Sequence, residues 1–130
     1  MDNFEKLKRN KKFILRYCMA MNENSLTKEE IMEFTDNESY IQMIMAYRNA
    51  FPDYIIYFED VTAEHDFVIV HGIFKGTHKG EIFGVPATFR KVEFPIIVKY
   101  QILDNKIINA WPMYDQMIIF EQLGVINRPA

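Results

Sequence analysis

The chain has 130 residues, 49 % of them hydrophobic and 25 % charged, which fits one soluble globular domain over residues 1–130. Apolar runs fall short of the ~20 residues that cross a bilayer, and the N-terminus lacks the pattern of a signal peptide. The single cysteine, Cys18, excludes an internal disulfide framework. We therefore expect a cytoplasmic protein.

Charge is distributed unevenly along the chain. Residues 1–16 hold six basic and two acidic residues, whereas residues 17–130 hold nine basic and sixteen acidic ones. A basic first helix is able to contact nucleic acid or anionic lipid, or its charges simply form a solvated face. Because the run is short and the net charge is −3, we favour the solvated face and expect neither nucleic acid nor a membrane as partner.

Helix signals fill the first 51 residues. Asp2 with Glu5, and Thr27 with Glu30, are spaced as capping boxes. Pro52 stops the helical pattern, because the residue before a proline avoids helical backbone angles. We expect helices over residues 3–21, 28–34 and 40–51.

After Pro52 the pattern changes to strands. We expect strands over residues 54–64, 67–78, 89–103 and 107–115, and a last helix over 116–123. The third strand alternates, with Val92, Phe94 and Ile96 on one face and charged residues on the other. Helices segregated from an antiparallel sheet define the α+β class. Apolar residues occur at both parities in several strands, which predicts a homodimer packed sheet to sheet.

The stretches "FPDYIIYFEDVTAEHDFVIVHGIFKGTHKGEIFGVPAT" and "VKYQILDNKIINAWPMYDQMIIFEQLG" carry F-P-D, G-T-H-x-G-x-x-x-G-x-P-x-T, D-x-K-I, W-x-x-x-D and L-G in order. Over residues 51–124 this resembles the SnoaL-like polyketide cyclase family of the nuclear-transport-factor-two-like superfamily. The resemblance implies a cystatin-like cone, in which a curved antiparallel sheet and N-terminal helices enclose a pocket, commonly as a homodimer and without a cofactor.

The resemblance also implies an acidic general base that removes a proton next to a carbonyl. Asp115, in "WPMYD", is the matching position. Strand parity places it with Trp111 and Met113, where poor solvation is expected to raise the carboxyl pKa. The alternative, equally open, is that Asp115 is the N-cap of the following helix.

Other candidate residues have weaker signals. His71 is the second catalytic candidate, as an acid or hydrogen-bond donor in the pocket, or else a core histidine. Tyr17, Gln101, Trp111 and Met113 are the expected substrate-binding residues, with core packing as the alternative for Tyr17 and Trp111. Pro112 and Gln101 depart from the family pattern, and this favours binding without catalysis.

The loop "GTHKGEIFGVPAT" (76–88) has three possible roles: a phosphate cradle, a metal site, or a connection over the pocket rim. A strand rather than a helix follows it, so a phosphate cradle is excluded. The histidines have no carboxylates at ligand spacing in the sequence, so we expect no metal site. We expect the glycines to supply positive φ angles and His78 to be structural.

These observations predict a protein that acts on a small apolar carbonyl-bearing ligand, as a cyclase, isomerase or dehydratase. Two alternatives stay open: a non-catalytic binding protein for a hydrophobic metabolite, and a dimerisation module whose cavity is filled by its own side chains. The first two readings require a pocket above ~300 Å³.

Overall fold

A computed structural model describes residues 2–23 and 25–127. Within these residues the helices are α1 (Asn3–Met21), α2 (Lys28–Ile31), α3 (Glu38–Ala50) and α4 (Gln116–Gln122). The strands are β1 (Ile55–Glu64), β2 (Phe67–Thr77), β3 (Lys91–Leu103) and β4 (Lys106–Met113). They form one antiparallel sheet in the order β1-β2-β3-β4, so every strand pairs with its neighbour in sequence. The α+β prediction is confirmed.

Side-chain caps fix where the helices begin. The Asp2 carboxylate accepts a hydrogen bond from the Glu5 backbone N–H at 2.8 Å, and Thr27 with Glu30 forms the complete capping box. The sequence placed the start of α3 at residue 40. It lies earlier because the Asn37 side chain accepts from the Tyr40 N–H at 3.1 Å, which makes Asn37 the N-cap.

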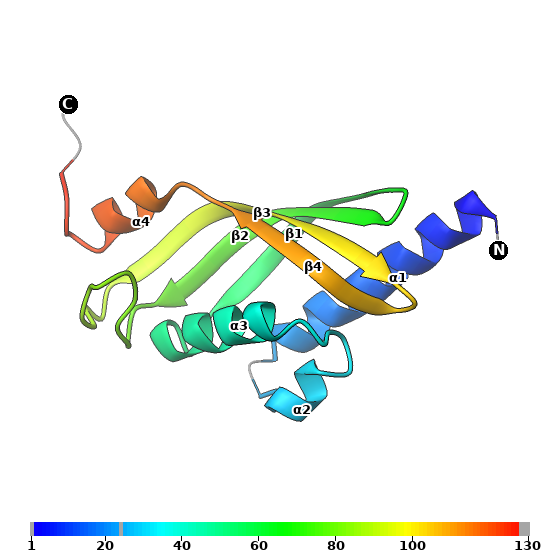
Figure 1. Ribbon diagram of the computed structural model, residues 1–130. Coiled ribbons are helices and arrows are strands. Elements are labelled where there is room, and N and C mark those ends of the chain that lie inside the picture. The colour runs from blue at the N-terminus through cyan, green and yellow to red at the C-terminus, as the bar shows by residue number, and fades with distance from the viewer. Residues whose placement is uncertain (1, 24, 128–130) are drawn as a thin grey trace.

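The helices α1, α2 and α3 lie on one side of the curved sheet, which we call its inner face (Figure 1). Side chains of Val68, Val70, Phe74, Phe94 and Val98 point to this face and are buried. On the opposite side, the outer face, no helix of the described residues covers the sheet (Figure 1). The inner face of the sheet therefore belongs to the core, and the outer face belongs to the surface. Residues on the two faces cannot contribute to one site.

Two β-bulges determine which side chains reach the inner face. In β1 the register shifts between Phe58 and Asp60. In β4 it shifts opposite Gln101 and Ile102, which leaves Ile108 as the extra residue. An extra residue reverses the facing of the residues that follow it. Simple alternation would put Ile107 and Trp111 on one face, but the bulge separates them: Ile107 is fully buried, whereas Trp111 is 44 % exposed.

The turns follow the sequence signals. Asp104 and Asn105 both have positive φ, 49° and 59°, as a two-residue hairpin turn requires. Gly124 follows α4 with φ 77°, the left-handed residue expected after a helix. None of the helices in the described part of the chain is both long and apolar enough to pass through a membrane.

Candidate functional site: a tyrosine-lined cavity

A cavity of about 70 Å³ lies between the inner face of the sheet and helices α1 and α3. Six of the chain's seven tyrosines line it: Tyr17, Tyr40, Tyr47, Tyr54, Tyr100 and Tyr114. The rest of the lining is mostly apolar and includes Met21, Met43 and Phe58. We call this space the tyrosine cavity. It holds about two water molecules at ~30 Å³ each, so it is smaller than the pocket expected from the sequence.

One group of phenols joins α1, α3 and β3. The hydroxyls of Tyr17 and Tyr40 lie 2.5 Å apart, and Tyr40 also interacts with the hydroxyl of Tyr100. The ring of Tyr17 meets Tyr100 edge-on at 5.9 Å between centroids. A chain of hydroxyls that donate to one another always leaves one terminal O–H to donate elsewhere.

A second pair lies at another part of the lining. The Tyr47 hydroxyl, from α3, is hydrogen-bonded to the Tyr114 hydroxyl, which follows β4. Between the two groups runs a stack of rings, in which Phe74 lies 5.0 Å from Tyr54 and 4.7 Å from Phe94. The polar atoms are thus set at the edges of an aromatic wall.

Burial keeps the phenols of the first group protonated. Desolvation raises the pKa of Tyr17, Tyr40 and Tyr100 well above the ordinary value of 10.0. It also raises the pKa of the Cys18 thiol, which lines the same cavity, to about 12. At neutral pH the described lining therefore offers hydrogen-bond donors. It contains no carboxylate or imidazole to act as a base.

Among the residues predicted for the site, Tyr17 lines the cavity and the others do not. Gln101 lies on the outer face, where its side-chain oxygen accepts a hydrogen bond from Asn109 at 2.9 Å. Trp111 and Met113 are exposed on the same face. Because of the bulge in β4, their neighbours Pro112 and Tyr114 reach the cavity instead.

Asp115 is the N-cap of α4. Its carboxylate accepts a hydrogen bond from the Met117 backbone N–H at 2.9 Å, and the residue is exposed. This geometry corresponds to the cap alternative of the sequence analysis. The residue is next in sequence to Tyr114, which lines the cavity, but Asp115 does not.

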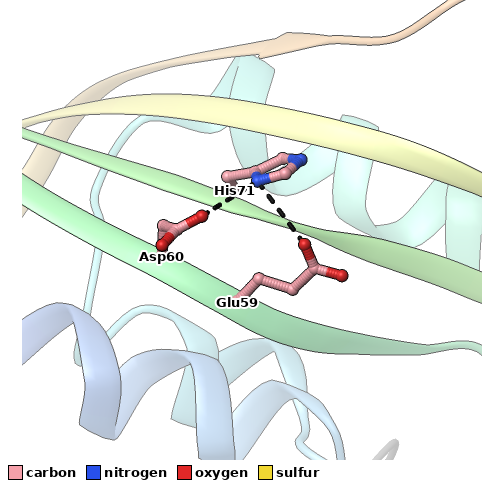
Figure 2. Close-up of side chains that lie close together, drawn as sticks. All are labelled: Glu59, Asp60 and His71. Atoms are coloured by element: carbon pink, nitrogen blue, oxygen red, sulfur yellow. Dashed lines mark hydrogen bonds and ion pairs between the residues drawn. The ribbon is translucent and has the colours of Figure 1, made fainter.

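His71 lies on the outer face rather than in the cavity (Figure 2). Its Nδ1 is 3.3 Å from a carboxylate oxygen of Asp60 and 3.7 Å from one of Glu59. The sequence spacing suggested that no histidine has carboxylates beside it. That expectation is wrong for His71, because strand pairing places Asp60 opposite it and the bulge adds Glu59. Among the described residues, Glu59, Asp60 and His71 are the group whose potential ligand atoms lie close enough together to hold a metal ion. They form a surface cluster in which the imidazole lies beside two carboxylates.

Comparison with known proteins agrees with this architecture. The model of the SnoaL-like polyketide cyclase family matches residues 19–123. The chain belongs to this family. A search of curated proteins found no match.

Solved structures share the SnoaL-like fold at low sequence identity. A provisionally assigned SnoaL-like polyketide cyclase from Jannaschia sp. CCS1 has a TM-score of 0.81 at 20 % identity, covering 98 % of this chain and 99 % of its own. AclR, a provisionally assigned hydroxylase from Streptomyces galilaeus, has 0.79 at 20 % identity, with coverage of 93 % and 99 %. IdmH, a provisionally assigned polyketide cyclase from Streptomyces antibioticus, has 0.72 at 23 % identity, with coverage of 89 % and 99 %.

The motifs that resemble the SnoaL-like family fix the 76–88 loop to the segments around it. The Asp53 carboxylate of F-P-D accepts hydrogen bonds from the Thr77 N–H at 2.8 Å and the Thr77 hydroxyl at 2.7 Å. The fully buried His78 accepts at Nδ1 from the Thr88 N–H at 3.1 Å. Of the loop glycines, Gly84 has the expected positive φ. Gly80 instead allows close approach, since a Cβ there would lie 2.3 Å from the Asn49 carbonyl oxygen.

Sequence reasoning missed five of the six cavity tyrosines. Tyr54 and Tyr100 face inward in or next to strands, Tyr40 and Tyr47 lie on one side of α3, and Tyr114 follows the bulge. The available signal was seven tyrosines in 130 residues. For Tyr40 and Tyr47, a spacing of seven residues on α3 indicates that both side chains lie on the same side of the helix. For Tyr114 no such signal was available, because the bulge sets its direction.

Proposed function

We propose that this SnoaL-like protein binds a small, apolar, carbonyl-bearing molecule in the tyrosine cavity, where phenol O–H groups donate hydrogen bonds to the carbonyl oxygen. The observation that supports this is the chemistry of the lining: aromatic and aliphatic walls with two phenol groups, each ending in a donor. Such a site selects an apolar body with one or two oxygen acceptors.

Binding requires the cavity to widen, because about 70 Å³ holds only a few atoms. Met21 and Met43 are in the lining, and unbranched methionine side chains change rotamer at low cost. The phenol pairs also have a second arrangement available, in which each hydroxyl donates to the ligand instead of to its partner. The filled-cavity alternative is the state in which neither change occurs.

The experiment compares α-tetralone with tetralin, which has the same rings without the carbonyl. We expect the ketone to bind about tenfold more tightly by calorimetry, the gain from one hydrogen bond of about 1.4 kcal/mol. Tyr47→Phe or Tyr17→Phe should reduce that preference, and Tyr57→Phe, a tyrosine 51 % exposed on the outer face, should not. Equal affinity for both compounds, or no binding of either, would contradict the proposal.

Catalysis is a second candidate, favoured by membership in a cyclase family. In this version the Asp115 carboxylate turns from the Met117 N–H toward the part of the cavity lined by Tyr114 and removes the proton next to the carbonyl, while a phenol polarises the carbonyl. His71 has no part because it lies on the outer face. Exchange of the α-protons of α-tetralone in heavy water, followed by NMR, tests it. Asp115→Asn should abolish the exchange while keeping the cap of α4, since asparagine is an equally good N-cap. If the α-protons exchange no faster with the protein than in buffer alone, catalysis is excluded and ligand binding is the function.

We also propose that two copies pair through the outer face. Its exposed apolar side chains are Tyr57, Ile69, Ile97, Trp111 and Met113. Ile97 pairs with Met113 across two strands, and exposed apolar groups on one face mark interaction sites. Sedimentation equilibrium should give the mass of a dimer, and Ile97→Asp that of a monomer. Phe89→Asp, at a site 71 % exposed outside the sheet, is the matched control. A native protein that is monomeric at every concentration would refute the pairing.

A further inference from the structure

The side of α1 that faces away from the sheet carries exposed apolar residues. While Ile14 and Tyr17 are buried against the sheet, Phe4 and Met19 are each 71 % exposed and Leu15 is 40 % exposed. Their spacings of eleven and four residues place them along one line of the helix. We call these three residues the apolar strip. The sequence pattern favours a solvated, charged face for this helix. That role does not explain why the apolar strip is exposed.

Basic side chains lie within and beside the apolar strip: Lys8 and Lys11 fall between Phe4 and Leu15 on the same line of the helix, and Lys12 and Arg16 lie to one side of it. Lys8, Lys11, Lys12 and Arg16 are exposed on the same side of α1. The Lys8 ammonium lies 5.7 Å from the ring centroid of Phe4. The Lys6 charge, by contrast, is paired with Asp66. The strip therefore lies in a positive field on a chain whose net charge is −3.

A surface hollow of about 480 Å³ adjoins this side of α1, where the helix passes the turn between β3 and β4. Four cations line it, Lys8, Arg9, Lys12 and Arg16, together with Glu5, Phe13 and Asn105. The Arg9 Nε is buried and, among the described residues, has no hydrogen-bond partner. Guanidinium groups bind phosphate oxygens through several donors at once, so the hollow has the charge and the size for a phosphate head group.

We propose that α1 docks the protein on an anionic lipid surface. The apolar strip enters the boundary between head groups and acyl chains, and the basic side chains bind the phosphates around it, the arrangement of an interfacial amphipathic helix. Duplex nucleic acid fits less well, since its phosphate backbone offers the strip no apolar surface. The N-terminal half of α1 projects at the end of the molecule that carries the β1–β2 and β3–β4 turns (Figure 1), where a flat surface is able to reach it.

Vesicle co-sedimentation of the full chain tests this, with phosphatidylcholine containing phosphatidylglycerol against phosphatidylcholine alone. We expect binding to the anionic vesicles only, weakened by salt. Each cation near such a surface changes partitioning about fivefold, so Lys8→Glu with Lys12→Glu should lower it at least ~25-fold. Phe4→Ser with Met19→Ser should lower it at least ~10-fold while leaving the salt dependence in place.

Lys79→Glu with Lys91→Glu is the matched control, because it changes the net charge equally at exposed positions outside α1, and it should retain binding. Equal binding to both vesicle types would overturn the proposal in favour of apolar adsorption. Binding of glycerol phosphate or duplex DNA without vesicle binding would overturn it in favour of a small-anion or nucleic-acid site. Binding unchanged by the α1 variants, or absent from both vesicle types, would also refute it.

Discussion

Above about pH 10 the protein should lose stability steeply while Tyr17, Tyr40 and Tyr100 remain protonated in the folded state. Burial raises the pKa of Tyr17, Tyr40 and Tyr100 above 10.0, the ordinary value that they regain on unfolding. As the pH rises past 10, the unfolded chain releases protons that the folded chain keeps. Each such tyrosine then lowers the free energy of unfolding by about 1.4 kcal/mol per pH unit.

The window of this loss follows from the direction of the shifts. Below pH 10 both states hold the phenol protons, so the stabilisation is fully present. It is lost from pH 10 upward, through the raised pKa of each folded tyrosine. Cys18 adds a similar loss that begins near 9.0 and ends near 12, since burial raises the thiol pKa over that interval.

Urea unfolding at a series of pH values on both sides of 10 measures the effect. Tyr100→Phe removes one titrating group, so its free energy of unfolding should fall about 1.4 kcal/mol per pH unit less steeply than that of the parent. Lysines also deprotonate in this range, but they are the same in both proteins and cancel in the comparison. Tyrosinate absorbance from Tyr100, obtained by difference, should appear only with loss of near-ultraviolet circular dichroism. Its appearance in the folded protein would show that the phenol is solvated.

The sequence was sufficient for most of the fold because the fold depends on local signals. Capping residues such as Thr27, the stop at Pro52 and the hairpin pair Asp104–Asn105 act within a few residues, and the structure contains all of them. The alternation in β3 is unbroken and was interpreted correctly, with Val92 and Phe94 buried. The family resemblance extended this to the whole sheet.

The residues that line the cavity were harder to predict from the sequence, because an alternating pattern of apolar residues does not reveal a bulge. Strict alternation from the buried Ile107 assigns Trp111 to the interior. The extra residue Ile108, which has no partner in β3, turns Trp111 outward and Tyr114 inward. A shift of one residue exchanges the two faces of a strand. Tyr40 and Tyr100 meet only after α3 has packed on β3, a pairing that no local signal encodes.

Phe74→Ala should be the most destabilising change in the cavity wall. Phe74 is 3 % exposed and lies at the centre of the aromatic cluster, with ring centroids 4.7 Å from Phe94, 5.0 Å from Tyr54 and 5.4 Å from Phe51. Removing a ring held on several sides costs the transfer free energy of its atoms and leaves a void. We expect a loss of about 3–5 kcal/mol in the free energy of unfolding.

Phe89→Ala is the matched control. Phe89 is 71 % exposed and has a φ of 60°, a conformation that phenylalanine and alanine share at similar cost, so the change tests loss of a ring without burial. It should alter stability by no more than about 0.5 kcal/mol. A loss below ~1 kcal/mol for Phe74→Ala, measured by urea unfolding, would mean that the ring stack does not support the fold.

The size of the Phe74→Ala loss also bears on ligand binding. If Met21 and Met43 move into the space, the void is small and the loss lies near 3 kcal/mol, because the cost rises with the volume left empty. In that case the Phe74→Ala variant should bind tetralin no more tightly than the parent protein does. If the wall is rigid, the loss approaches 5 kcal/mol and the variant should bind tetralin more tightly, as dry apolar cavities bind hydrocarbons. The first result would show that the lining adapts, which a cavity of 70 Å³ requires if it is to accept a ligand.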